Sequence, residues 1–339
     1  MTHPRIWVIP GNRPGDDAQV YALAEELGLP FETRKLVFNW RFWLSGKYMG
    51  ASPVSVDREI RDRTLVPPWP DLIIMVGRRA VPIARWVQQQ NGERTRLVYV
   101  GHPRVSPELF DLVYTTRQYL TPEGASIRLQ PVAMSRYREK PRPSDEERWW
   151  LNSLPRPHLL LMLGGETRHW TMRPHAIAGQ AAKLALRAQR TGGSLIVVRS
   201  ARTTDEVLDK IERRLEGGGC EWRVVRHDFP RFPVLLDDAD ELFPTADSIS
   251  MISESVITGK PVGIVPAEMK LMGWIVLGGE RKMRTNPARD LRRFWNYVLG
   301  EKLAGSMDAP AASATPNPVV DAAREVRALL ESTFGKLSV

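Results

Sequence analysis

Short runs of β-forming residues alternate with helix-length segments along almost the whole chain, and this alternation restricts the possible folds more than any other feature. Such alternation is typical of βαβ units, in which neighbouring strands are parallel and helices cover the sheet. The chain has 339 residues, more than one hydrophobic core usually organises. We therefore expect an α/β protein with two Rossmann-like domains that face a cleft.

The strand and helix patterns fall into two groups. In the first half, strands are predicted over residues 6–10, 34–38, 72–76, 97–100 and 112–115, and helices near residues 17–28 and 80–90. In the second half, strands are predicted over residues 158–163, 194–199, 222–225, 241–244 and 261–265, and helices near residues 174–190, 203–215, 232–237 and 248–258.

Two stretches of unusual composition interrupt this pattern. Residues 139–148 are rich in charge and proline, which favours a domain boundary. Residues 308–318 are rich in alanine and proline and precede a final amphipathic helix near residues 319–334. We expect an N-terminal domain over residues 1–152, a C-terminal domain over residues 153–305, and a Pro/Ala-rich linker with a helix over residues 306–339.

Composition and charge limit the possible partners. Apolar residues make up 42% of the chain and charged residues 26%, and no run of about eighteen apolar residues is present. The first residues lack a secretory signal, which favours a cytoplasmic protein. The net charge of +9 favours phosphorylated small molecules or anionic lipid. Nucleic acid is not expected because no known binding motif occurs, and no cysteine or histidine cluster suggests a metal site.

The most specific local pattern lies at residues 245–264, where a predicted strand is followed by hydroxyl residues and a helix. The start of a helix exposes unpaired N–H groups, so the hydroxyls of Ser248 and Ser250 could complete a phosphate site. Asp247, directly before them, is a further ligand-binding candidate. Glu254 shares a helix face with Ser250 and could accept hydrogen bonds from ribose hydroxyls. The alternative is that Ser248 only caps the helix and that Glu254 is a surface charge.

A glycine pair follows the first predicted strand of the second half. Gly164 and Gly165 would let the backbone approach a pyrophosphate at the carboxyl edge of a parallel sheet. A single glycine pair is weak evidence, and it gains weight because the segment that begins at Asp247 follows a strand of the same predicted sheet.

Loops of the first half carry candidates for acid–base chemistry. Gly11 and Asn12 occupy the position of a Rossmann phosphate loop, but G-x-G-x-x-G is absent, so a tight NAD site is not supported. Asp16 and His102 follow two predicted strands and could exchange protons near neutral pH. The alternative for each is a loop residue with incidental charge.

Residues 39–49 combine aromatic and basic side chains. That composition suits contact with lipid headgroups or with a lipid-linked acceptor. It equally suits a helix that is packed under the sheet.

Several of these segments together resemble a known family. They are Gly15-Asp16 with Gln19, Leu23 and Leu27-Gly28; residues 70–74 with Gly77-Arg78; residues 110–113; Leu163-Gly164-Gly165; residues 200–203; and residues 245–254 with 258–262. The match covers roughly residues 5–300 and resembles the family of the plant "elongated mitochondria" fission factor, whose bacterial members are classed by similarity as glycosyltransferases. Residues 200–203 and 229–232 depart from the usual family pattern.

The resemblance implies the two-Rossmann GT-B type of glycosyltransferase, with the donor nucleotide-sugar on the second domain and the acceptor on the first. It implies that Gly164 and Gly165 face the diphosphate, that Ser248 and Ser250 lie at the phosphate-binding helix, and that Glu254 holds the ribose. The base would be bordered by Arg199, Ser200, Arg202, His227 and Phe229. This type usually needs no bound metal, and the nucleotide-sugar is a substrate, so no cofactor is expected.

Three functions remain open from the sequence. The first is sugar transfer from a nucleotide-sugar to an acceptor that the sequence does not identify, a lipid-linked acceptor being one option, with Asp16 or His102 as base. The second is a non-catalytic adaptor or membrane-recruitment protein on the same fold. The third is a nucleotide-sugar epimerase, which would act without an acceptor. Whichever function holds, we expect a cytoplasmic protein that can be peripheral on the inner face of the membrane.

Overall fold

The computed structural model describes residues 3–43, 49–121, 124–137 and 141–335. The chain divides into two compact units. The first contains residues 1–117, 121–136 and 318–339, and the second contains residues 118–120 and 137–317. Residues 318–339, at the end of the chain, thus join the first unit, whereas the Pro/Ala-rich residues before them belong to the second.

A six-stranded parallel sheet forms the centre of the first unit, in the order β2-β1-β3-β4-β5-β6. The inner strands are almost entirely buried, and β1 and β3 are continuous apolar runs, as expected for a parallel sheet covered by helices. The strands are β1 (Ile6–Ile9), β2 (Phe31–Thr33), β3 (Leu72–Val76), β4 (Arg96–Val100), β5 (Leu112–Thr116) and β6 (Ile127–Gln130).

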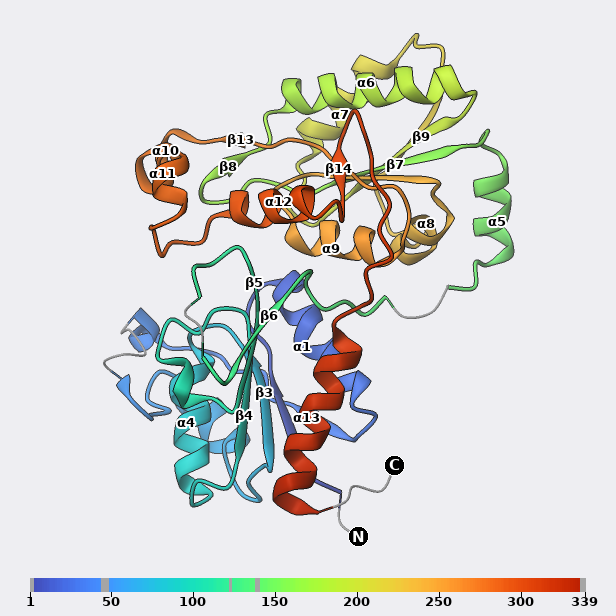
Figure 1. Cartoon of the computed structure of the whole chain (residues 1–339). Helices are drawn as coiled ribbons and strands as arrows, with labels where there is room; N and C mark the ends of the chain where they lie inside the picture. Colours follow the sequence, from blue (N-terminus) through green and yellow to red (C-terminus); the bar gives the residue numbers. More distant parts are fainter. Residues whose placement is uncertain (1–2, 44–48, 122–123, 138–140, 336–339) are drawn as a thin grey trace. The chain divides into compact units, whose positions relative to one another are not determined.

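Helices pack on both faces of this sheet. Helix α13 (Val319–Phe334), from the end of the chain, lies beside α1 (Pro14–Glu26) over one face (Figure 1). The hydroxyl of Tyr114 on β5 donates to the carboxylate of Glu325 at 2.9 Å, which ties α13 to the sheet. The other face contacts α4 (Ala80–Gln90), and the remaining helices are η1 (Trp40–Trp43), α3 (Arg58–Thr64) and η2 (Pro107–Leu109).

A four-stranded parallel sheet in the order β10-β9-β7-β11 forms the centre of the second unit. Its strands are β7 (His158–Leu163), β9 (Ser194–Arg199), β10 (Glu221–Val225) and β11 (Glu241–Pro244). Two smaller sheets pair β8 (Trp170–Thr171) with β13 (Glu268–Met269) and β12 (Gly263–Ile264) with β14 (Gly305–Ser306). The helices are α5 (Asp145–Asn152), α6 (Pro174–Thr191), α7 (Asp205–Leu215), α8 (Phe232–Asp238), α9 (Ile249–Ile257), α10 (Leu271–Leu277), α11 (Glu280–Met283) and α12 (Leu291–Gly300).

The sequence pattern located most of these elements but not all. The strand predicted over residues 34–38 is wrong, because β2 ends at Thr33 and only Phe38 forms a later bridge, to Val56. The pattern also missed β6, α3, α5 and the helices between residues 271 and 300. Within the described residues, no helix has the length and apolar character needed to cross a bilayer.

Candidate functional site

Three loops of the second unit meet at the carboxyl edge of its sheet. They follow β7, β9 and β11, which are adjacent strands, and parallel strands place their carboxyl ends together. The loop after β7 contains the glycine pair, the loop after β9 contains residues 200–203, and the loop after β11 leads into α9. The convergence of the glycine pair and the α9 start, which the sequence predicted, is therefore present in the structure.

Hydrogen bonds connect the glycine pair directly to the loop before α9. The amide of Gly164 donates to the hydroxyl of Thr245 at 2.8 Å, and the amide of Gly165 donates to Asp247 Oδ2 at 2.9 Å. The sequence predicted that these glycines face a diphosphate. Because both amides already have partners, a diphosphate would need other donors, and that role of the pair stays a prediction.

Close packing explains why glycine occupies both positions. A Cβ atom at Gly164 would lie 2.2 Å from Asp247 Oδ2, and one at Gly165 would lie 2.3 Å from the carbonyl oxygen of Arg202. Neither separation is physically possible for a side chain, so any other residue would push the three loops apart.

Asp247 lies at the centre of the junction that these three loops form. Its buried carboxylate accepts hydrogen bonds from the Gly165 amide and from Thr245, and it pairs with the Arg202 guanidinium at 2.9 Å. Arg202 also donates to the carbonyl oxygen of Gly165 at 2.9 Å. A buried carboxylate with this many donors organises the loops, and Arg202 offsets its negative charge next to the predicted phosphate site.

Helix α9 begins at this junction and carries the predicted ribose carboxylate. Ser248 is its N-cap, and its hydroxyl accepts from the Met251 amide. Glu254 lies four residues after Ser250, on the same face, and is half-buried. No hydrogen bond or ion pair to Glu254 occurs in the described part of the chain. The surrounding protein atoms displace water and raise the pKa of Glu254 to about 7.

The sequence reasoning missed one residue that supports this loop. The indole N–H of Trp295, on α12, donates to the carbonyl oxygen of Ala246 at 2.8 Å. Its ring packs edge-on against Trp170, which lies on β8 after the glycine loop. Trp295 thus joins two loops of the site, and its position 49 residues after Ala246 gives no local signal for this role.

The remaining second-unit candidates divide into two groups. Ser200 belongs to the junction, because its hydroxyl donates to the Gly164 carbonyl at 2.9 Å. Arg199 pairs with Asp205 at 2.6 Å at the end of β9. His227 and Phe229 are exposed in the loop after β10, the edge strand, and the structure records no contact from either to the junction.

Candidates of the first unit lie at the carboxyl edge of its own sheet. The Gly11 amide donates to Asp17 Oδ1 at 2.5 Å, so Asp17 closes the loop after β1, a role that the sequence reasoning did not assign. Asn12 is exposed, and Asp16 is half-buried in the first turn of α1. His102 follows β4, and burial, with Arg104 nearby, lowers its pKa. Strand β3 lies between β1 and β4, so the loops that lead to Asp16 and His102 follow strands that are not adjacent.

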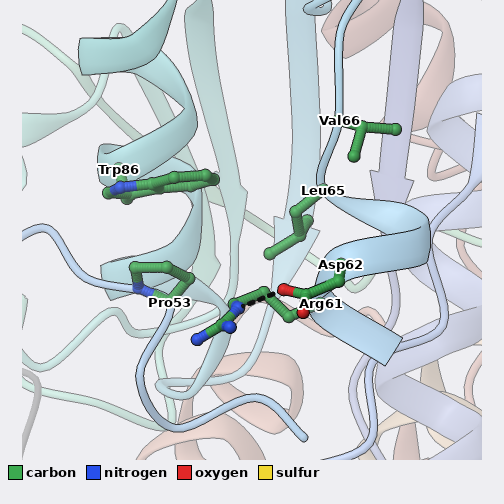
Figure 2. Close-up of a pocket in the computed structure, with 6 residues that line it drawn as sticks. All are labelled: Pro53, Arg61, Asp62, Leu65, Val66 and Trp86. Atoms are coloured by element: carbon green, nitrogen blue, oxygen red, sulfur yellow. Dashed lines mark hydrogen bonds and ion pairs between the residues drawn. The ribbon is translucent and has the colours of Figure 1, made fainter. Parts of the chain in front are cut away.

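A depression of about 430 Å³ on the first unit lies between α3 and α4, with Trp86 on one side and Arg61 and Asp62 on the other (Figure 2). Arg61 pairs with Asp62 at 2.8 Å, so the two lining charges neutralise each other. This arrangement offers no reactive group. The described residues also hold no cluster of three or more His, Cys, Asp or Glu placed to bind a metal ion.

The aromatic segment predicted for lipid contact is partly described. Trp40 and Trp43 on η1 are exposed by 72% and 73%, so they are not packed under the sheet. Residues 44–48 lie outside the described residues.

Comparison with known proteins identifies the family. A model of the family described as "Mitochondrial fission ELM1" matches residues 14–297. The chain belongs to this family. The Arabidopsis thaliana mitochondrial fission protein ELM1 is 24% identical over 261 residues, which are 67% of this chain and 60% of that protein. An uncharacterized protein of Rickettsia prowazekii is 30% identical over 108 residues, 32% of this chain and 30% of its relative. The chain thus spans less than two thirds of either curated relative.

Solved structures show the fold of this ELM1-family chain. A Listeria monocytogenes protein assigned as a UDP-N-acetylglucosamine 2-epimerase has a TM-score of 0.56 at 13% identity and covers 99% of this chain and 98% of its own. S. aureus MnaA, solved with UDP, has a TM-score of 0.53 at 14% identity, with 98% of each chain covered. The chain therefore shares the fold of these two proteins, an α/β fold with two Rossmann-like units of the GT-B type, as the sequence predicted.

Proposed function

We propose that the second unit binds a nucleotide-sugar and that the chain is a glycosyltransferase that passes the sugar to an acceptor hydroxyl. Glu254 is the observation that carries the proposal. It is a half-buried carboxylate whose only recorded perturbation is loss of water, on the helix that starts at the carboxyl edge of the sheet. A ribose offers two adjacent hydroxyl donors, which a carboxylate with unused acceptor sites can bind.

The diphosphate would lie against the start of α9. The first N–H groups of that helix and its macrodipole favour an anion, and the Ser250 hydroxyl lies in the same turn. The glycine-pair amides have partners, so their role is to hold the loop close to α9. Arg202 supplies positive charge at the junction but must share it with Asp247.

The proposed transfer step follows from this placement. The acceptor oxygen attacks the anomeric carbon while the bond from that carbon to the diphosphate oxygen breaks, and the acceptor proton passes to a base. Asp16 and His102 remain the proposed bases. Burial lowers the pKa of His102, which favours the neutral imidazole that a base requires. The leaving diphosphate would be stabilised by the helix start and by Arg202.

An epimerase is the second candidate, because the Listeria monocytogenes protein and S. aureus MnaA share the fold over nearly the whole chain. An epimerase would convert a nucleotide-sugar with no acceptor present. The similarity to a plant mitochondrial fission protein is also compatible with a third candidate, a non-catalytic adaptor.

A binding screen tests the proposal. UDP-, ADP-, GDP- and CMP-sugars are titrated calorimetrically into the wild-type chain, into Glu254→Gln and into the control Glu301→Gln, which changes an exposed glutamate of the same unit. We expect one nucleotide class to bind, with at least about tenfold weaker affinity for Glu254→Gln alone. Absence of binding by all four classes would refute the proposal. Turnover of the bound sugar without acceptor would favour the epimerase.

A further inference from the structure

Helix α10 in the second unit exposes an apolar surface that the site does not use. Leu271 is 76% exposed, Met272 54%, Trp274 57% and Ile275 60%. Successive residues of a helix are about 100° apart, so these four cover the whole outward side, while Gly273 and Leu277 face the protein. Soluble proteins rarely expose so large a contiguous group of apolar side chains unless it contacts another surface.

The structure holds α10 firmly in this orientation. A Cβ atom at Gly273 would lie 2.6 Å from the His169 carbonyl oxygen, so the inner side of the helix is pressed directly against the glycine loop. The Lys270 amide donates to the same carbonyl at 2.9 Å, and the Lys270 ammonium pairs with Glu166 at 2.7 Å. The apolar side chains are therefore presented by a fixed helix.

Side chains of the protein donate hydrogen bonds to two backbone carbonyls at the end of α10. Asn286 Nδ2 donates to the Val276 carbonyl at 2.6 Å, and Arg292 donates to the Gly278 carbonyl at 2.8 Å. Arg292 is itself neutralised by the buried Asp290. Backbone carbonyls with internal partners do not need water, so this helix end can enter a poorly hydrated environment at little cost.

Basic residues follow the apolar surface immediately. Arg281, Lys282 and Arg284 are exposed, and within the described ranges none of them forms a recorded ion pair. Glu280 is the one acidic residue of residues 270–284, which carry a net charge of +3 from four basic residues and one acidic residue. In Figure 1, α10 and α11 lie together at one edge of the second unit, away from α5.

We propose that α10 and the basic residues after it dock the protein on the surface of an anionic phospholipid bilayer. Leu271, Met272, Trp274 and Ile275 would enter the headgroup region, and Arg281, Lys282 and Arg284 would contact lipid phosphates. Tryptophan beside aliphatic residues and free cations is the composition that favours this interface. The glycine loop packs on the inner side of α10, so docking would place the proposed donor site close to the membrane.

Vesicle flotation with the full chain tests this proposal. Vesicles of phosphatidylcholine alone are compared with vesicles that contain about 30% phosphatidylglycerol. We expect the wild-type chain to bind only the anionic vesicles. The double variant Leu271→Ser/Ile275→Ser and the triple variant Arg281→Gln/Lys282→Gln/Arg284→Gln should each bind them at least about tenfold more weakly. Trp149→Ser changes a tryptophan on α5 that is more exposed than Trp274, and this variant should bind normally. Trp274→Phe should also bind but should lose quenching by brominated lipid.

Several outcomes would overturn the proposal. Unchanged binding of the Leu271→Ser/Ile275→Ser variant would exclude α10, and loss in Trp40→Ser/Trp43→Ser alone would assign the contact to η1. A wild-type dimer in solution that becomes monomeric in the α10 variant, without lipid binding by either, would identify the surface as a contact between copies. Circular dichroism checks that each variant is folded, and donor binding, measured without vesicles, should be unaffected by the α10 changes.

Discussion

Replacing Glu254 with glutamine should abolish a specific pH dependence of nucleotide-sugar binding. The pKa of Glu254 in the free protein is about 7, because the surrounding atoms exclude water. Ribose hydroxyls donate only to the ionised carboxylate with full strength, so binding should pull this pKa down and release a proton. At pH 6 only about one tenth of the carboxylate is ionised, so apparent affinity should be about tenfold weaker at pH 6 than at pH 8.

Titration of Glu254 should also make the free energy of unfolding depend on pH, and the direction of this dependence follows from the raised pKa. The pKa of about 7 in the folded protein lies above the ordinary value of 4.5, so the folded chain binds more protons between these pH values. The associated stability is fully present below pH 4.5 and is lost as the pH rises through 7. Because Glu254 keeps some exposure to solvent, we expect a loss of about 1–3 kcal/mol in the wild-type chain and none in Glu254→Gln.

The assay is calorimetric titration with an intact nucleotide-sugar, whose diphosphate has no ionisation between about pH 6 and pH 8 and so adds no pH dependence of its own. Repeating the titration in buffers of different ionisation enthalpy counts the protons released. Equal pH dependence in the wild type and in Glu254→Gln would refute the reasoning. So would a carboxyl group that titrates near its ordinary pKa in the free protein, as followed by carbon NMR with the variant as the reference for assignment.

Three further predictions concern the junction and the core. Gly164→Ala would place a methyl group 2.2 Å from Asp247 Oδ2, so urea unfolding should show a free energy of unfolding that is lower by about 2–4 kcal/mol. The control Gly179→Ala changes a helical position with open space and should raise the free energy of unfolding by about 0.5–1 kcal/mol. Trp295→Phe removes the hydrogen bond to the Ala246 carbonyl and should cost about 1–2 kcal/mol, with weaker donor binding in the same samples; unchanged affinity would separate this tryptophan from the site. Arg231 holds the pKa of buried Glu147 at about 2, below its ordinary value, so the stability from this pair is present above pH 4.5 and is lost as the pH falls through 2. Because Arg231 is half-exposed to solvent, the expected loss of stability is small, and an identical acid profile for Glu147→Gln would contradict this assignment.

The sequence was informative where local pattern and fold topology coincide. Apolar runs such as residues 72–76 and 159–163 are typical of strands that are buried on both faces, and they located β3 and β7 correctly. The carboxyl ends of parallel strands share one edge, which is why the glycine pair and the α9 start could be predicted to meet without any knowledge of contacts.

Hydrogen-bond partners could not be predicted in the same way. The amides of Gly164 and Gly165 were expected to be open for a ligand, but Thr245 and Asp247, some eighty residues later, accept their hydrogen bonds. Trp295 reaches the same loop from a helix that the pattern missed. Each of these contacts depends on loop conformations with no periodicity, so no local feature of the sequence encodes them.

The sequence by itself determined most of the sheet strands and their covering helices, the two parallel sheets and the edge at which their loops gather, because hydrophobic burial acts through the regular spacing of residues. Only the tertiary structure decided which groups at that edge keep unused hydrogen-bonding capacity and which side of an apolar helix stays uncovered. Glu254 and α10 show the difference, since their surroundings come from segments distant in the chain and are fixed only when those segments pack.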